Sequence, residues 1–189
     1  KHLGNFGNIG CLSFNGNKII TTGGGGAIIT NNKNLAKKIR HLITTAKVKH
    51  AWEYEHNEIG YNLRMPNLNA ALGVAQLEKI DLFLKAKKIL FKKYKEKISK
   101  IDGIELFEQR KSANSNYWLQ TIILSKNKSI YKDKIIRLAH KDLLFLRPAW
   151  KLISTLRPYK DKQKMKLAGS HDIYKRVINI PSSQNLILK

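Results

Sequence analysis

The stretch "CLSFNGNKIITTGGGGAII", residues 11–29, decides how this sequence is interpreted. It places Lys18 between an Asn-Gly pair and four consecutive glycines. The apolar run that precedes Lys18 predicts a buried strand, and the β-branched runs at residues 18–22 and 26–32 predict two strands joined by a tight turn. Because the chain is rich in lysine elsewhere, the position of this single amine requires a chemical explanation.

The glycines near Lys18 do not form either of the common nucleotide-binding motifs. A P-loop needs the pattern G-x-x-x-x-G-K-[ST], but Asn17 separates Gly16 from the lysine and Ile19 stands where a magnesium-binding hydroxyl is required. The glycine run also lacks a G-x-G-x-x-G pattern that opens a helix. The local sequence therefore excludes a P-loop and gives little support to a dinucleotide site.

Lys18 has two interpretations from local chemistry alone. A lysine that forms a Schiff base must be partly desolvated so that its amine is neutral, and an apolar strand leading into a turn can hold it in that way. Ser13 precedes it on the same segment and can offer its hydroxyl to an anion. The alternative is a hairpin lysine that points into water, and the spacing alone favours that alternative.

Helical patterns follow the glycine-rich stretch. Residues 35–46 carry apolar side chains on one face, and Asn34 or Asn32 can cap this helix. A second helical pattern follows Pro66, where small residues on one stripe indicate close packing against another element. A lysine-rich helix is then expected to run to residue 101.

The pattern changes after residue 101, where strands alternate with a helix as in an α/β unit. The charged helix that begins after residue 81 marks a boundary. We predict one domain over residues 1–81 and a second over residues 82–189. Within the second domain, strands are expected in residues 104–107, 116–124 and 143–150, and a helix is expected over residues 130–142.

The composition limits the class of protein. The 189 residues include 36 Lys+Arg and 13 Asp+Glu, which gives a formal net charge of +23. Lysine supplies most of this charge and falls on the polar faces of predicted helices, so we expect solvated faces more than a nucleic-acid surface. No apolar stretch approaches the roughly 18 residues of a membrane span, and Cys11 stands alone. These features predict a soluble, cytoplasmic protein.

Several segments resemble the sugar-nucleotide aminotransferases of the DegT/StrS type, which are pyridoxal phosphate enzymes. "GNIGCLSFNGNKIITTGGGGAIITNN" at residues 7–32 is similar to the lysine segment of that family. "HNEIGYNLRMPNLNAALGVAQLEKID" at residues 56–81 is similar to its second signature, and "LRPAW" and "INIPSS" match its small domain. The resemblance implies an α/β fold-type I PLP-dependent transferase: the C-terminal part of the large domain, then the small α/β domain, with the N-terminal half missing.

The resemblance implies roles for three residues. Lys18 matches the lysine that forms the Schiff base with pyridoxal 5′-phosphate and then moves a proton between substrate and cofactor. Ser13 matches the serine that holds the cofactor phosphate. Asn62 matches the asparagine that reaches this phosphate from the neighbouring subunit, which implies a homodimer with shared active sites. Without the resemblance, the preferred interpretation of Asn62 is a residue that stabilises the loop after Gly60.

Four further residues are expected to contact the substrate. Asn15 stands where many family members carry a histidine. Arg64 is expected to pair with an anionic group of the substrate or cofactor, and a buried structural ion pair is its alternative. Arg147 follows a predicted strand together with Trp150, for which core packing is expected. His56, the fourth, belongs to an aromatic loop.

That loop contains His50, Trp52, Tyr54 and His56. Their spacing is not that of a zinc cage, and the family that the sequence resembles is metal-free. We therefore expect no metal, and we expect a loop that faces the substrate or a dimer interface.

The segments "SFNGNK", "TTAKVKHAWEYEH" and "SNYWL" resemble the branch that makes 4-amino sugar nucleotides for legionaminic acid-type nonulosonates. The expected reaction moves an amino group, with glutamate as the donor, to the 4-keto carbon of a 6-deoxy sugar nucleotide. The family's N-terminal half supplies the acidic partner of the pyridine nitrogen and the ring that stacks on the cofactor. Residues 1–189 alone are therefore expected to be inactive.

Three alternatives stay open at this point. A 3-keto sugar nucleotide is a possible substrate within the same family. A non-catalytic or dehydratase-like relative is a second alternative, although Lys18 argues against dehydratase-type members, which carry a histidine there. A basic nucleic-acid-binding module is the third, and a salt-dependent gel shift would support it.

Overall fold

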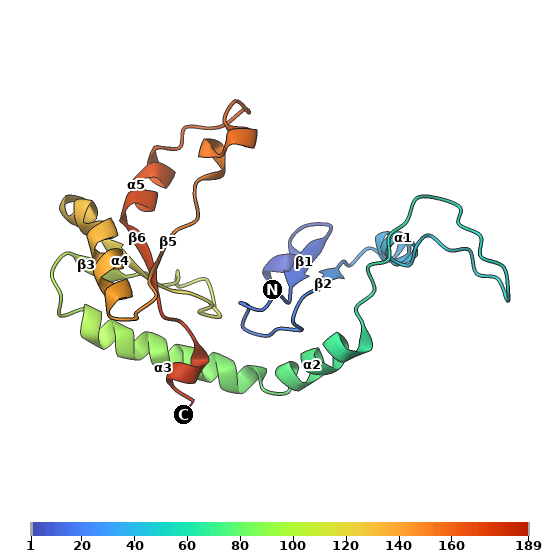
Figure 1. Cartoon of the computed structure of the whole chain (residues 1–189), viewed down its shortest axis with the longest axis horizontal. Coiled ribbons are helices and arrows are strands. Elements are labelled where there is room, and N and C mark those ends of the chain that lie inside the picture. Colours follow the sequence, from blue (N-terminus) through green and yellow to red (C-terminus); the bar gives the residue numbers. More distant parts are fainter. Residues whose placement is uncertain (1, 189) are drawn as a thin grey trace. The chain divides into compact units, whose positions relative to one another are not determined.

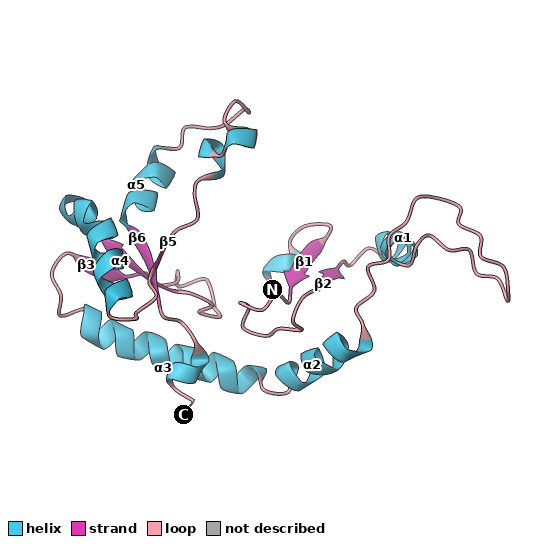
Figure 2. Ribbon diagram, in the orientation of Figure 1, coloured by secondary structure: helices cyan, strands magenta, loops and turns pink. Residues whose placement is uncertain are grey.

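The computed structural model of the protein describes residues 2–188. The chain divides into two compact units, Lys1–Ile80 and Asp81–Lys189, and each contains its own sheet (Figure 1). The first sheet has two strands and the second has four. Figure 2 draws strands in magenta and helices in cyan. Within the described residues, no helix is both long enough and apolar enough to cross a membrane.

In the first unit, strand β1 (Gly10–Ser13) pairs antiparallel with strand β2 (Gly26–Ile29). The predicted strand at residues 18–22 is wrong, because residues 18–20 form a bend and Thr21 and Thr22 belong to no regular element. The N–H of Phe14 donates to the carbonyl oxygen of Gly25 at 3.0 Å, so the pairing passes directly from β1 to β2 and leaves the intervening residues as a loop.

The helices of the first unit begin where the sequence predicts. Helix α1 (Lys33–Ile43) is capped by Asn32, whose side-chain oxygen accepts hydrogen bonds from the N–H groups of Asn34 and Leu35 at 2.9 and 3.1 Å. Helix α2 (Asn67–Leu77) begins directly after Pro66. A short 3-10 helix, η1 (Leu3–Asn5), precedes β1.

The second unit is built on an antiparallel sheet with the strand order β3-β4-β6-β5. Helix α3 (Ile80–Ile98) packs Phe91 and Tyr94 against the core of this unit. The central cluster of buried residues consists of Ile98, Leu106, Ile122, Leu124, Leu146 and Ile178. The other elements are β3 (Ile104–Leu106), β4 (Gln120–Leu124), η2 (Lys126–Tyr131), α4 (Lys132–Lys141), β5 (Arg147–Pro148), η3 (Ile153–Thr155), η4 (Arg157–Tyr159), α5 (Ala168–Arg176), β6 (Val177–Ile180) and η5 (Gln184–Leu186).

Three expectations for the second unit are wrong. The strand expected over residues 143–150 is confined to β5, because Leu143 has a φ of 59° and Pro148 has no N–H to donate. Trp150 is 67% exposed and is not a core residue. Lys87 is only 3% exposed, so the lysine-rich helix does not place all of its amines in water.

Candidate functional site

Lys18 lies directly after a tight turn that follows β1. Its N–H donates to the carbonyl oxygen of Asn15 at 3.0 Å, which closes the turn around Gly16 and Asn17. Ser13 is the last residue of β1, and its Oγ accepts a hydrogen bond from the N–H of Asn15 at 3.4 Å. The turn therefore places a hydroxyl and an amine on the same short loop.

The loop that carries Lys18 is anchored at Thr22, which is buried. The N–H of Thr22 donates to the carbonyl oxygen of Phe14 at 3.1 Å, and its own carbonyl accepts from Nδ2 of Asn69 in α2 at 2.5 Å. A Cβ at Gly73 would lie 2.9 Å from Cγ2 of Thr22, so glycine permits this approach. The close packing predicted for the small residues on the stripe of Leu68 and Leu72 is not found, because Ala71 and Ala75 are exposed. The close contact of α2 is at Gly73 instead.

Residues 44–64 form an irregular hairpin between α1 and α2. Thr45 and Ala46 have φ values of 67° and 51°, which residues with a side chain rarely adopt. The N–H of Thr45 donates to the carbonyl oxygen of Tyr61 at 3.0 Å. A Cβ at Gly60 would lie 2.3 Å from the carbonyl carbon of Thr45. Only glycine at position 60 therefore permits the hairpin base to close in this way.

Pairing continues further out on this hairpin. Lys47 pairs with His56 in an antiparallel bridge, and the N–H of Val48 donates to the carbonyl oxygen of Glu55 at 2.8 Å. Nδ1 of His56 lies 2.7 Å from the carbonyl oxygen of Thr45, and Nδ1 carries a proton because a carbonyl only accepts. The neutral ring therefore presents Nε2 as an acceptor, and the protonated ring presents it as a donor.

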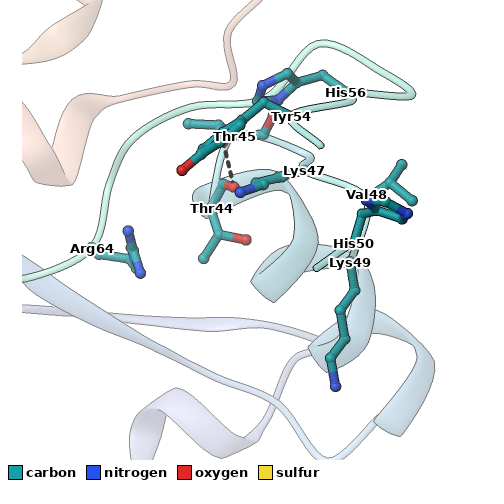
Figure 3. A pocket seen from close by; sticks show the side chains of 9 residues that line it. All are labelled: Thr44, Thr45, Lys47, Val48, Lys49, His50, Tyr54, His56 and Arg64. Carbon is teal, nitrogen blue, oxygen red and sulfur yellow. Dashed lines mark hydrogen bonds between the residues drawn. The ribbon is translucent and has the colours of Figure 1, made fainter. Parts of the chain in front are cut away.

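A cavity of about 550 Å³ opens beside the hairpin (Figure 3). In Figure 3 the amine of Lys47 and the hydroxyl of Tyr54 turn toward the side on which Arg64 lies, whereas Lys49 extends away from them. Nζ of Lys47 lies 3.6 Å from the centroid of the Tyr54 ring. The cavity is lined by Thr44, Thr45, Lys47, Val48, Lys49, His50, Tyr54, His56 and Arg64, none of which is acidic.

The structure brings some of the predicted site residues together. His56 and Arg64 line this cavity, and Asn62 pairs with Thr44, another lining residue. Ser13 ends β1, Asn15 and Lys18 belong to the turn that follows it, and none of the three lines the cavity. The sequence did not single out Lys47, which lines this cavity, although it stands among basic and aromatic residues in "KVKHAWEYEH".

Arg147 lies in the second unit, on the edge strand β5, where it is exposed and pairs with Asn179 of β6. The exposed ring of Trp150 stacks on Trp118 with the ring centroids 6.0 Å apart. Arg147 therefore belongs to a different unit from the other predicted site residues.

Lys87 is a buried lysine of the second unit. Its Nζ donates to the carbonyl oxygens of Ser182 at 2.5 Å and Trp118 at 3.3 Å. Burial lowers the pKa of the Lys87 amine, because the charged form loses its hydration. Tyr94 donates through its hydroxyl to the carbonyl oxygen of Pro181 at 2.9 Å, so two side chains of α3 hold the segment after β6.

Acidic side chains in the first unit are partly neutralised by neighbours. Glu58 forms an ion pair with Lys38 and lies 3.4 Å from Nε2 of His41. Neither Lys38 nor His41 lines the cavity. Across residues 2–188, no three His, Cys, Asp or Glu side chains cluster as a metal ion would require.

A solved structure of an aminotransferase has the same fold. Helicobacter pylori PseC, an aminotransferase involved in the biosynthesis of pseudoaminic acid, superposes with a TM-score of 0.91 and 25% sequence identity. The match covers 98% of this chain and 51% of PseC. The fold is therefore that of part of a fold-type I PLP-dependent transferase, as the sequence predicts.

The family follows from the sequence match. Residues 1–189 match the DegT/DnrJ/EryC1/StrS aminotransferase family, and the chain belongs to this family. EpsN of Bacillus subtilis (strain 168), assigned to the pyridoxal phosphate-dependent aminotransferases, is 38% identical over 194 residues, which are 98% of this chain and 48% of EpsN. GDP-perosamine synthase of Escherichia coli O157:H7 is 36% identical over 187 residues, 98% of this chain and 50% of that protein. The chain spans about half the length of the curated relatives it matches.

Enzymes of this family depend on pyridoxal 5′-phosphate, and the loop after β1 fits that cofactor chemically. Lys18 has the primary amine that an aldehyde requires. The hydroxyl of Ser13 accepts one long hydrogen bond and keeps its own proton to donate to a phosphate oxygen.

Proposed function

We propose that the protein containing this chain is a pyridoxal phosphate-dependent aminotransferase that moves an amino group from glutamate to the 4-keto carbon of a 6-deoxy sugar nucleotide. The observation that carries the proposal is Lys18 on the turn after Ser13 in a chain that matches the family over residues 1–189. The names of the perosamine synthase and PseC support a sugar carrying an amino group as product, in surface-glycan or nonulosonate biosynthesis. The 4-keto position and the glutamate donor rest on the sequence resemblance.

We assign proton transfer to Lys18. The bound cofactor supplies an electron sink for the carbon that gains or loses the amino group. Nζ of Lys18 would carry the proton between that carbon and C4′ of the cofactor, as a general acid and base. The hydrogen bond to Asn15 holds the backbone of Lys18, so its side chain extends from a fixed position on the loop.

We assign the cofactor phosphate to Ser13 and to Asn62 of a neighbouring subunit. Ser13 Oγ would donate to a phosphate oxygen, and the side-chain amide of Asn62 would add a second donor. The bridge between Asn62 and Thr44 gives this residue a fixed place at the hairpin base, which suits a contact across a subunit interface. The active site is then a property of a homodimer.

We assign four residues to the substrate, on different grounds. His56 and Arg64 line the basic cavity of the first unit. Asn15 belongs to the turn that carries Lys18. Arg147 stands on an exposed edge strand, and its assignment rests on the resemblance alone.

Borohydride reduction of the holoenzyme, made from the complete gene, tests the assignment of Lys18. Peptide mass spectrometry is expected to find the reduced cofactor on Lys18, and Lys18→Ala is expected to lower kcat by about 10⁴-fold or more, because acid–base catalysis alone contributes up to about 10⁴. Lys33→Ala in α1 is the matched control and should retain activity. Cofactor trapped on another lysine would overturn the mechanism. NMR of the product distinguishes C4 from C3 amination.

A further inference from the structure

The face of α2 that meets the loop of Lys18 is polar and small. Asn69, Gly73 and Gln76 are the residues of α2 that are not exposed, and their spacing of four and three places them on one side of the helix. The apolar side chains of Leu68 and Leu72 are exposed instead. Burial of apolar side chains of α2 therefore does not hold this face in place, and specific contacts of the three inward residues have to do so.

Asn69 and Gly73 both meet Thr22, which ends the loop of Lys18. Nδ2 of Asn69 donates to the carbonyl oxygen of Thr22 at 2.5 Å. One turn further along α2, a Cβ at Gly73 would lie 2.9 Å from Cγ2 of Thr22. Thr22 is 3% exposed, so its carbonyl oxygen has little access to water that could replace the amide. The side-chain amide of Asn69 therefore fixes Thr22 against α2.

The position of Thr22 fixes the rest of the loop, because both ends of the loop meet at Phe14. The N–H of Thr22 and the hydroxyl of Thr21 donate to the carbonyl oxygen of Phe14 at 3.1 and 3.0 Å. Between these ends, the N–H of Lys18 donates to the carbonyl oxygen of Asn15 at 3.0 Å. These bonds make a short closed loop, so a movement of Thr22 away from α2 moves the backbone of Lys18 with it.

We propose that Asn69 is a positioning residue for Lys18: its amide holds Thr22 on α2 and so sets the point from which the side chain of Lys18 extends. The inference rests on the proposed function, because that function gives Lys18 the proton transfer. An amine that transfers a proton has to lie within hydrogen-bond reach of the reacting carbon. A displacement of about 1 Å lowers the rate of such a step by about a hundred-fold.

Two substitutions remove the amide donor and keep the approximate size of the side chain. Asn69→Asp places an ionised carboxylate, which only accepts, beside the carbonyl oxygen of Thr22, and Asn69→Leu places a methyl group there. Asn67→Asp is the matched control, since it adds the same charge at an exposed position of the same helix. All variants are made in the enzyme expressed from the complete gene.

Hydrogen exchange of the PLP-loaded enzyme, followed by mass spectrometry, reports on the loop without any catalysis. Both Asn69 variants are expected to speed exchange in the peptide that contains residues 14–25 by about ten-fold, because losing a buried hydrogen bond raises the population of the open loop by about this factor. Asn67→Asp should exchange as the wild-type enzyme does. Unchanged exchange in both Asn69 variants would overturn the proposal.

Steady-state kinetics per bound cofactor separate positioning from stability. Both Asn69 variants are expected to lower kcat by about ten- to hundred-fold, with the KM for the amino donor within about two-fold of wild type. A residue that only stabilises the fold would lower the melting temperature and the fraction of loaded enzyme but leave kcat per bound cofactor unchanged. Faster exchange with a wild-type kcat would therefore overturn the positioning role.

Gly73→Ala decides the outcome should both Asn69 variants fail to fold. Its Cβ would displace Thr22, whereas alanine itself favours the helix, so the change acts on the position of the loop more than on the stability of α2. A kcat lowered by about ten-fold is expected. A wild-type kcat in this variant would contradict the proposal.

The proposed function can fail separately. Cofactor trapped by borohydride on another lysine would reject the role of Lys18, even where hydrogen exchange shows that Asn69 holds the loop. Cofactor trapped on Lys18, together with an unchanged kcat in the Asn69 variants, would leave the proposed function standing and overturn the positioning role alone.

Discussion

Lys87 is a lysine of α3 whose amine lies inside the second unit. Its exposed neighbour Lys88 belongs to the same helix and the same run of lysines, so residue type alone does not distinguish them. Two carbonyl oxygens, of Ser182 and Trp118, accept hydrogen bonds from Lys87 Nζ. Burial lowers the pKa of this amine below its usual value of 10.5. The folded protein therefore gives up this proton at a lower pH than the unfolded chain does.

This difference predicts a pH dependence of stability. Between the lowered pKa of Lys87 and 10.5, the unfolded state binds the proton and the folded state does not, so the free energy of unfolding rises with pH in that interval. Lys87→Met is expected to remove this contribution to the slope, whereas Lys88→Met is expected to keep it. Urea unfolding at pH values from about 7 to about 10 measures both slopes. An unchanged slope in Lys87→Met would contradict the prediction.

The hairpin at residues 44–64 depends at the element scale on one close contact. A Cβ at Gly60 would lie 2.3 Å from the carbonyl carbon of Thr45 and 2.4 Å from the N of Ala46, and these backbone atoms cannot yield as a side chain can. Gly60→Ala is therefore expected to lower the free energy of unfolding by about 1–3 kcal/mol.

The control for this change is Gly169→Ala in α5, where a Cβ would meet no atom within 4 Å. Alanine is the better helix former, so this variant is expected to be neutral or more stable by up to about 1 kcal/mol. Differential scanning calorimetry compares the two variants. Equal melting temperatures for Gly60→Ala and the wild-type protein would show that the hairpin base tolerates a side chain.

Elements with a local signal were predictable from the sequence. The apolar run before Ser13 predicted β1, and Asn32 was one of the two caps expected for α1. Residues 18–22 were wrongly predicted as a strand because their β-branched composition favours one. In the structure the hydrogen bond between Phe14 and Gly25 continues the pairing of β1 with β2, and residues 18–22 lie in the loop between these strands. Helix α5 and strand β6 were not predicted, since β6 is defined by its pairing with β4 and β5.

In the candidate site, too, only the part with a local sequence signal could be predicted. The segment of Ser13 and Lys18 was recognisable because its residues are adjacent in sequence. The approach of Lys47, Tyr54 and Arg64 to one cavity depends on the positive φ values at Thr45 and Ala46, and neither residue type indicates such a conformation.

At the scale of the whole molecule, the chain covers about half the length of relatives that are named as enzymes. We expect the isolated 189-residue chain to show no transamination and only weak binding of pyridoxal phosphate. The physical reason is that the resemblance places the acidic partner of the pyridine nitrogen, which makes the cofactor an electron sink, in the other half.

Absorbance of the isolated chain after addition of pyridoxal phosphate, followed by product analysis, checks this expectation. The protein made from the complete gene serves as the positive control under the same conditions. Turnover by the isolated chain that disappears in Lys18→Ala would show that residues 1–189 hold a sufficient site.

Two backbone pairs divide the hairpin into a base and a tip that differ in how well they tolerate changes of length. Thr44 pairs with Asn62 and Lys47 pairs with His56 in the base, and the exposed Trp52 lies in the tip beyond both pairs. Insertions or deletions around Trp52 change the reach of the tip without moving Asn62 or Arg64, because exposed loop tips tolerate changes of length. A change of length at the tip is therefore expected to leave the backbone pairs of the base in place.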